Sequence, residues 1–256
     1  GDKAKVLVEA LEGLSYVMLR VTMLVMWFAP FAVFAAVSAA IARSGIGILG
    51  TYGKFMGEFY LGIVLLWGLL FCAAYLVIGK RAVALFRAVR EPTLLAFATA
   101  SSEAAYPKTL AQLEKFGCSN RVAAFVLPLG YSFNLDGSMM YCTFAVLFIA
   151  QAYGIELSAG QQLTMLLILM VTSKGMAGVP RASLVVIAAT LAQFNIPEAG
   201  LLLLLGVDHF LDMARSATNV IGNSVATAVV SAWDGQLRSE AQVNAELKLA
   251  LGNGEG

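Results

Sequence analysis

Charged residues are scarce in this chain, and neither sign is in excess. Asp, Glu, Lys and Arg make up 13% of the 256 residues, whereas about 25% is usual in soluble domains. Because 17 basic and 16 acidic residues leave a net charge of +1, the composition gives no reason to expect a nucleic-acid partner. Hydrophobic residues account for 59% and the mean hydropathy is +0.79, which is more apolar surface than one core can bury. We therefore expect a lipid bilayer around much of the chain.

Cysteine is equally scarce. Cys72, Cys118 and Cys142 lie in or beside apolar segments, and no C-x-x-C spacing occurs. Neither a disulfide framework nor a zinc site is expected, and the three side chains are predicted to be small buried hydrophobic groups.

A signal-peptide pattern is also missing at the start, so we expect Gly1 to begin a fragment or a processed chain.

Two long apolar runs without charge are present near the start. Val21–Ala42 has 22 residues and Phe59–Ile78 has 20, so each can span a hydrocarbon core of about 30 Å as a helix. Pro30 is expected to kink the first of these helices.

From Lys80 onward the apolar stretches become short and are interrupted by small polar residues. The breaks are SSEAAYP at 101–107 and SKGMAGVP at 173–180, and a long apolar stretch that carries polar residues follows each of them. Paired breaks of this kind predict two repeats with a transporter's binding site near the bilayer midplane. The alternative is that Gly and Pro only kink two full-length helices, but the charged Glu103 and Lys174 inside the breaks argue against it.

The flanking charges predict the orientation of the two broken segments. The loops at 154–160 and 195–200 hold Glu156 and Glu198 but no basic residue. By the positive-inside rule these loops face outward, and the loops around the first break are cytoplasmic. The first hairpin is therefore expected to enter from inside and the second from outside. The basic residues around the first break are Lys80, Arg81, Arg87, Arg90, Lys115 and Arg121.

The last apolar stretch contains five polar residues at helical spacing. They follow one another at intervals of 4, 3, 4 and 4 residues, which places them within about 80° of one helix face. Ionisable groups at membrane depth indicate a functional site by default, although an internal ion pair that only joins helices is the alternative. The five are Asp208, Asp212, Arg215, Asn219 and Asn223, with Ser216 at the edge of the stripe.

A second isolated charge, Asp136, lies in the sequence NLDGS at 134–138. Its carboxylate, the amide oxygen of Asn134, the hydroxyl of Ser138 and backbone carbonyls near Gly137 suit a hard cation. A buried, hydrogen-bonded structural acid is the alternative.

Glu103 and Lys174 could pair with each other, carry protons or be solvated. His209 is expected to be a packing residue.

Four ordered motifs resemble those of the dicarboxylate/amino acid:cation symporter family. They are SSEAAYP, PLGYSFNLDGS at 128–138, SKGMAGVP and DHFLDMARSATNVIGN at 208–223, and the resemblance extends from about Leu14 to Trp233. It implies an all-α membrane protein with transmembrane helices and two re-entrant helical hairpins in an inverted repeat, an elevator mechanism and a homotrimer. The chain is similar to the second half of such a protein, from the fifth helix onward.

The resemblance also implies a division of the chain. Residues 1–50 would hold a scaffold-type transmembrane helix and loop, and residues 51–235 a transport domain with re-entrant hairpins at about 82–118 and about 158–196. A polar tail, 236–256, would follow as a short helix or disorder.

The resemblance assigns substrate and cation positions, which we treat as expectations. Residues at the two hairpin tips would hold one substrate carboxylate, Ser138 and Arg215 the distal carboxylate, and Asp212 an α-amino group. The expected substrate residues are Ser101, Ser102, Ser138, Ala177, Gly178, Val179, Asp212, Arg215, Ser216 and Asn219. The expected sodium positions are Gly130, Ser132, Asn134, Asp136, Ser173, Asn219 and Asn223.

Three positions depart from the sodium-coupled pattern. Asn223 stands where those members have an Asp, Lys174 brings a positive charge near a cation position, and Glu103 occupies a position that is usually Ser in amino-acid carriers. All three resemble the proton-coupled dicarboxylate branch, whereas that branch generally lacks the acid that Asp212 supplies. A possible proton or charge switch is therefore assigned to Glu103 and Lys174.

These features favour symport of glutamate or aspartate with H+ or Na+, in a multi-pass protein of the plasma or inner membrane. No enzyme activity and no cofactor are expected. The alternative is a C4-dicarboxylate:proton symporter for succinate, fumarate or malate. A remote alternative is an intramembrane aspartyl hydrolase that uses Asp136 and Asp208.

Overall fold

The computed structural model describes residues 27–174, 176, 178, 180–239 and 241–243, with ten further positions between 5 and 24. This part of the chain is helical, and its one β contact is an isolated bridge between Cys118 and Leu237. The prediction of an all-α protein is confirmed for the described residues.

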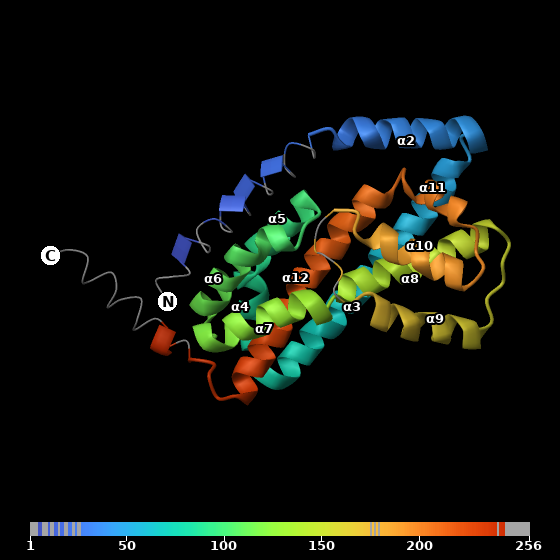
Figure 1. Cartoon of the computed structure of the whole chain (residues 1–256). Helices are drawn as coiled ribbons and strands as arrows, with labels where there is room; N and C mark the ends of the chain where they lie inside the picture. The colour runs from blue at the N-terminus through green and yellow to red at the C-terminus, as the bar shows by residue number, and fades with distance from the viewer. Residues whose placement is uncertain are drawn as a thin grey trace.

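The helices are named as in Figure 1. In chain order they are α2 (Ala29–Ser44), α3 (Ile48–Ile78), α4 (Arg81–Ala88), α5 (Arg90–Thr99), α6 (Tyr106–Phe116), α7 (Asn120–Phe133), α8 (Asp136–Ala152), α9 (Ala159–Thr172), α10 (Ser183–Gln193), α11 (Leu201–Leu204) and α12 (Asp208–Trp233). Two 3-10 turns, Glu103–Ala105 and Glu198–Gly200, precede α6 and α11.

The first apolar run is not the single kinked helix that the sequence predicts. Trp27 and Phe28 form a turn, and α2 begins at Ala29 with Pro30 in its first turn. Proline is well tolerated there, because the first N–H groups of a helix have no partner within it. Pro30 therefore starts a helix instead of kinking one.

Two stretches are long and apolar enough to cross a membrane, judged by length and composition: Ile48–Ile78 and Asn120–Ala152. The first is α3, which is longer than the predicted 59–78 because an i,i+4 ion pair between Lys54 and Glu58 (3.8 Å) is compatible with a helix. The second is interrupted at Asn134 and Leu135, which separate α7 from α8.

Both predicted breaks divide pairs of short helices. The chain turns back at 100–105, so that α6 packs against α5 and α4; on either side of the second break, α10 packs against α9 and α8. We refer to residues 81–116 as the first hairpin and 159–193 as the second. The re-entrant hairpins predicted at about 82–118 and about 158–196 and the domain division stay predictions.

Helix α12 lies in the middle of the molecule (Figure 1). It packs against α3, α5, α7 and α8, and 18 of its 26 residues are buried. Since most of the helix is enclosed, its polar residues must find partners within the protein, either in α12 itself or on the surrounding helices.

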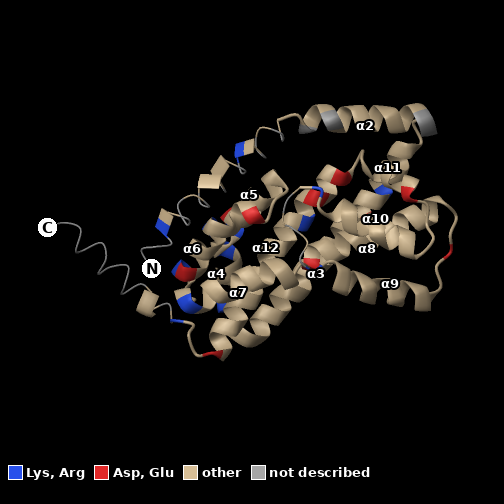
Figure 2. Ribbon diagram, viewed as in Figure 1, with Lys and Arg blue, Asp and Glu red and all other residues tan. Residues whose placement is uncertain are grey.

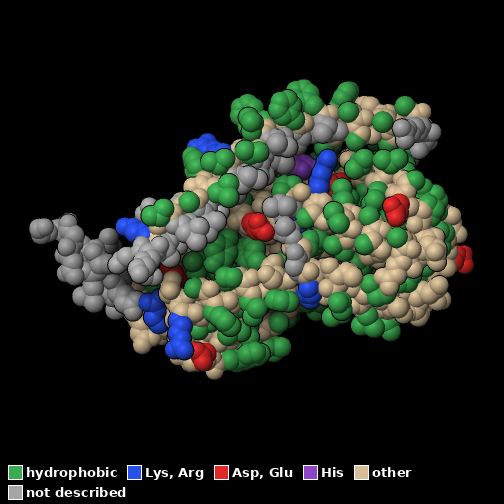
Figure 3. Space-filling view, in the orientation of Figure 1, with side chains coloured by type: hydrophobic (Ala, Val, Ile, Leu, Met, Phe, Trp, Pro, Cys, Tyr) green, Lys and Arg blue, Asp and Glu red, His purple; other side chains and the backbone are tan. Residues whose placement is uncertain are grey.

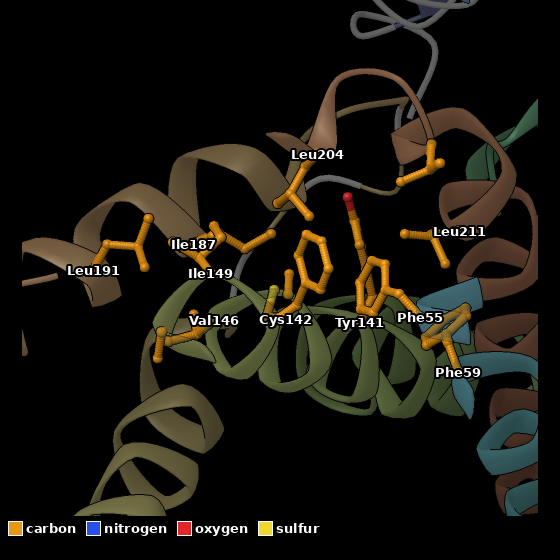
Figure 4. Packing of buried hydrophobic residues seen from close by; sticks show 14 of the residues in the cluster. Phe55, Phe59, Tyr141, Cys142, Val146, Ile149, Ile187, Leu191, Leu204 and Leu211 are labelled. Carbon is orange, nitrogen blue, oxygen red and sulfur yellow. The ribbon is translucent and has the colours of Figure 1, made fainter. Parts of the chain in front are cut away.

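The larger hydrophobic core surrounds α8. Phe55 of α3 stacks on Phe148 with ring centroids 4.2 Å apart. Figure 4 shows the core side chains of α8 facing those of α3, α10, α11 and α12; labelled are Phe55, Phe59, Tyr141, Cys142, Val146, Ile149, Ile187, Leu191, Leu204 and Leu211.

The cysteines differ from one another in burial. Cys118 and Cys142 are buried as predicted, but Cys72 is exposed. The prediction for Cys72 is wrong because it lies on the outer side of α3, where exposed Leu69, Tyr75 and Leu76 also lie.

Many large hydrophobic side chains are exposed, and the face drawn in Figure 3 shows few charges between them. Many of these side chains belong to α3, including Leu61, Val64 and Leu65. Basic residues gather at the end of the molecule that holds α4 and α6 (Figure 2). An apolar surface with charge at one end is what a bilayer requires.

The segment after α12 returns to this charged end. Leu237 bridges to Cys118, and the Arg238 N–H donates to the Gly117 carbonyl at 2.9 Å. Residues 241–243 are helical, whereas residue 240 and residues 244–256 lie outside the described residues, so the expectation of a short helix or disorder in the tail stays a prediction.

Gly137 lets the first turn of α8 lie close against the backbone of α12. A Cβ at this position would lie 2.3 Å from the backbone oxygen of Arg215, which cannot move without shifting α12. Gly137→Ala should therefore lower the stability of the purified protein in detergent by about 1–3 kcal/mol.

The measurement is the thermal unfolding midpoint of both variants and the native protein. Gly160→Ala is the matched control, because Gly160 is also helical and a Cβ there has no atom within 4 Å. The expected decrease is at least about 2 °C for Gly137→Ala and none for the control; equal midpoints would contradict the close packing.

Candidate functional site

Helix α12 carries the predicted polar stripe, and all five residues are buried. Their exposed fractions are at most 1%, so the stripe faces into the molecule. The members are Asp208, Asp212, Arg215, Asn219 and Asn223.

The centre of the stripe is an ion pair between Arg215 and Asp212, in which Arg215 Nε donates to Asp212 Oδ1. The guanidinium also donates from Nη1 to Ser138 Oγ (3.2 Å) and from Nη2 to Ser216 Oγ (3.0 Å). A fully buried guanidinium is tolerated because it has both a counter-charge and hydrogen-bond acceptors.

Asn219 joins α12 to the first turn of α8. Its Oδ1 accepts hydrogen bonds from the N–H groups of Gly137 (2.9 Å) and Ser138 (3.3 Å), and its Nδ2 donates to Ser138 Oγ at 2.9 Å. The first N–H groups of a helix have no partner within that helix. The break before α8 therefore presents donors inside the molecule, and Asn219 satisfies two of them.

The two hairpin tips meet at Gly178. Ser101 Oγ donates to the Gly178 carbonyl at 2.9 Å, and the Gly178 N–H donates to Glu103 Oε1 at 2.8 Å. Ser102 is buried beside them, and its hydroxyl has no partner among the described residues. Thus three of the five predicted tip residues lie together, while Ala177 and Val179 lie outside the described residues.

Sequence reasoning did not assign a role to Arg181. Its N–H donates to Asp212 Oδ2 at 2.9 Å, and its Nε lies 3.3 Å from Asp208 Oδ2. Its φ is +66°, a conformation that non-glycine residues adopt rarely and at functional sites more often than elsewhere. An arginine directly after a break at membrane depth was the available signal.

Asp208 completes this part of the site. The hydroxyl of Tyr141, on α8, donates to Asp208 Oδ1 at 2.5 Å, while the Arg181 guanidinium lies beside Asp208 Oδ2. The sequence placed Asp208 on the stripe but did not identify these two partners, because neither Tyr141 nor Arg181 is near it in the chain.

The predicted cation residues gather where α7 and α8 are separated. Asn134 Nδ2 donates to Asn223 Oδ1 at 3.1 Å, and a Cβ on Gly130 would lie 2.4 Å from the same oxygen. Asp136 Oδ2 would lie 2.3 Å from a Cβ on Gly222. One carboxylate and amide oxygens are therefore near one another, which suits a hard cation.

Other predicted cation positions have less support. Ser132 is half-buried, and Ser173 is buried with a hydroxyl that has no partner among the described residues. The described residues contain no group of three or more His, Cys, Asp or Glu side chains that could hold a metal ion. Any cation here would depend on amide, hydroxyl and backbone oxygens together with Asp136.

Glu103 and Lys174 are not paired with each other. Glu103 accepts from Gly178 N–H, and the Lys174 ammonium donates to the Phe133 carbonyl at the end of α7. The suggested ion pair between them is therefore wrong, because each side chain reaches a backbone group of a different element. His209 is half-buried, and its ring lies edge-on to that of Phe210, its neighbour in the chain; its role as a packing residue stays a prediction.

Comparison with known proteins identifies relatives along almost the whole chain. The model of the sodium:dicarboxylate symporter family matches residues 1–233. The proton/sodium-glutamate symport protein of Bacillus subtilis is 41% identical over 235 residues, which cover 92% of this chain and 55% of that protein. The same-named protein of Geobacillus stearothermophilus is 42% identical, covering 94% of this chain and 57% of the relative.

A second group of relatives has a different name. The C4-dicarboxylate transport protein of Burkholderia pseudomallei is 42% identical over 257 residues, covering all of this chain and 59% of that protein. The chain thus spans 55–59% of the length of these relatives. With the family model matched over residues 1–233 and relatives above 40% identity, the chain belongs to the sodium:dicarboxylate symporter family.

Proposed function

We propose that the protein is a secondary active symporter that takes up an acidic amino acid, glutamate or aspartate, with H+ or Na+. The observation that carries this proposal is the buried pair Asp212 and Arg215 on one face of α12. An acidic amino acid has an ammonium and a carboxylate for these two charges, whereas a dicarboxylate would be repelled by Asp212.

The contacts within the site support a distribution of roles. Arg215 and Ser138, which already share a hydrogen bond, would hold the distal carboxylate, since a guanidinium binds a carboxylate with two parallel hydrogen bonds. Asp212 would hold the α-amino group and Asn219 a further polar atom. Ser101, Ser102 and the backbone at Gly178 would hold the other carboxylate, with Ala177 and Val179 by resemblance; Ser216 would support Arg215.

The cation would bind where Asn134, Asp136 and Asn223 gather, with Gly130, Ser132, Ser173 and Asn219 contributing by resemblance. Family membership implies coupling cations. We favour protons over sodium because Asn223 is neutral and a neutral amide is a weaker sodium ligand than a carboxylate.

A C4-dicarboxylate:proton symporter is the second candidate. Relatives with that name are as similar as the glutamate symporters, and Glu103, Lys174 and Asn223 resemble that branch. Asp212 opposes this assignment, because a buried carboxylate beside a dianionic substrate is unfavourable.

The structure argues against the aspartyl hydrolase. Asp136 lies against Gly222, which is 14 residues beyond Asp208 on the same helix and thus about 21 Å along its axis. The two carboxylates cannot share a proton at this separation. Family and relatives also point to transport and away from an enzyme.

Further parts of the proposal rest on the family. A symporter family implies a membrane location, and we propose a multi-pass protein of the plasma or inner membrane. Elevator movement of residues 51–235, re-entrant hairpins and a homotrimer in the whole protein belong to the same proposal.

Uptake of labelled L-glutamate into proteoliposomes tests the function and the ion. The longest available form of the protein is used, with D-aspartate or succinate as competitor and a sodium or pH gradient imposed separately. We expect competition by D-aspartate and uptake driven by a pH gradient. Competition by succinate alone would favour the second candidate, and a response only to sodium would contradict proton coupling.

Asp212→Asn tests the amino-group partner. The amide keeps an oxygen for the Arg181 N–H, which Asp212 Oδ2 accepts at 2.9 Å, but removes the negative charge. Glutamate binding should weaken by at least about 30-fold, which corresponds to about 2 kcal/mol for loss of one partner of a buried charge pair. Calorimetric titration measures this effect, and unchanged affinity in a folded variant would exclude the assigned role.

Arg215→Ala tests the partner of the distal carboxylate. Glutamate affinity should fall by a similar factor, and the preference should shift toward neutral amino acids, which do not need the guanidinium. Thermal unfolding of the same sample shows whether the variant is folded, because removing one member of a buried pair is also destabilising. Undiminished glutamate affinity in the folded variant would rule out the role.

A further inference from the structure

Gly178 has both of its backbone polar groups bonded to the first hairpin. Its carbonyl accepts from Ser101 Oγ at 2.9 Å and from the Glu103 N–H at 3.4 Å. Its N–H donates to the Glu103 carboxylate at 2.8 Å. Among the described residues, the only side-chain charge in this contact between the two tips is therefore a carboxylate, bound to the backbone N–H of the opposite tip.

The surroundings of Gly178 form a small donor site for an anion. Ser102 is fully buried, and its hydroxyl has no partner among the described residues. It lies beside Gly178, since a Cβ on Gly178 would be 2.5 Å from Ser102 Oγ. Tyr131 fixes the position of Ser102 by donating to its carbonyl at 3.0 Å. A backbone N–H and a buried hydroxyl are thus close together, and Glu103 uses only the first.

Glu103 is held at this site by its contacts with Gly178 and not by a counter-ion. No basic residue in the described part of the chain forms an ion pair with Glu103, and Lys174, the lysine of the second tip, donates to Phe133 instead. The side chain is also exposed, so its carboxylate can leave the N–H for water without becoming a buried unpaired charge.

We propose that Glu103 is a tethered carboxylate that occupies an anion position between the tips and competes there with a carboxylate of the substrate. This inference rests on the proposed function, in which Ser101, Ser102 and Gly178 bind that carboxylate. It applies to an acidic amino acid and to a dicarboxylate alike, because both carry the group that Glu103 imitates.

The competition follows from chemistry and from covalent attachment. The side chain and the substrate offer the same functional group, and a donor N–H binds one carboxylate oxygen at a time. A group on the same chain is present at a high effective concentration. The substrate must displace Glu103. The apparent Kd of the substrate is therefore its intrinsic Kd divided by the fraction of molecules in which the position is free.

The same contact also closes the two tips on each other in the absence of substrate. Glu103 is therefore a gating and specificity residue: a ligand without a carboxylate cannot replace it at Gly178, whereas an acidic ligand can. The tips would then separate when a substrate carboxylate replaces Glu103 at Gly178.

Substrate titration tests the competition. Calorimetry with L-glutamate and with succinate is done on the native protein, Glu103→Ala, Glu103→Gln and the control Glu156→Gln, whose parent residue is an exposed carboxylate in another loop. We expect Kd to decrease by about tenfold in Glu103→Ala, near the lower end for a hydrogen bond to a charged group. Glu103→Gln should show a smaller decrease, because its neutral oxygen can still accept, and the control none.

If the native protein binds substrate and both Glu103 variants bind it with unchanged or weaker affinity, the proposal is overturned. If the native protein binds neither ligand, the proposed function fails, and the closure of the tips is decided by a second measurement that needs no substrate.

The second measurement is the rate of maleimide labelling at Ser102→Cys in a Cys72→Ser background, which removes the exposed native thiol. Adding Glu103→Ala should raise this rate several-fold, because the tips separate more often, whereas adding Glu156→Ala should not. Equal rates in these two variants would overturn the closure of the tips by Glu103.

Discussion

The structure depends on keeping one guanidinium charged inside an apolar protein. Arg215 is fully buried, and an arginine at membrane depth costs at least about 2.5 kcal/mol unless it finds partners. Asp212 supplies the counter-charge, and Ser138 and Ser216 supply acceptors. Those partners determine the surrounding geometry: Ser138 must stand in the first turn of α8, the helix must begin beside α12, and Gly137 must have no side chain for the two backbones to approach.

The interruptions of the helices also supply polar partners inside the protein. A continuous helix satisfies its own N–H and C=O groups and has little to give a ligand. The break before α8 and the two hairpin tips release backbone groups inside the molecule, where Asn219 and Glu103 take up some of them. In the proposed function, substrate recognition and fold stability thus use the same few donors. For this reason a side chain of the protein, the carboxylate of Glu103, carries the same chemical group as the proposed substrate.

Much of this architecture is encoded locally and could be predicted. The spacing of polar residues identified the buried face of α12, and small residues with Pro or charge marked both breaks. The rest required tertiary positions: Arg181 meets Asp208 and Asp212, 27 and 31 residues away, and no periodicity reports such a contact. Local signals also misled, since Pro30 can begin a helix as easily as kink one, and the exposure of Cys72 depends on which side of α3 faces outward.

The pairing of Asp212 with Arg215 lies within a single helix, at a separation of three residues, and this matters during synthesis. Helix α12 is made last among the described helices, although Trp67 of α3 bonds to Thr218 across 151 residues. At 5–20 residues per second, α3 waits roughly 8–30 s for that partner. Asp212 and Arg215, in contrast, can neutralise each other as soon as the helix forms, whereas Asp208, the third charged residue of α12, pairs with Arg181 outside the helix. The guanidinium of Arg215 therefore has its counter-charge before any other helix has packed against α12.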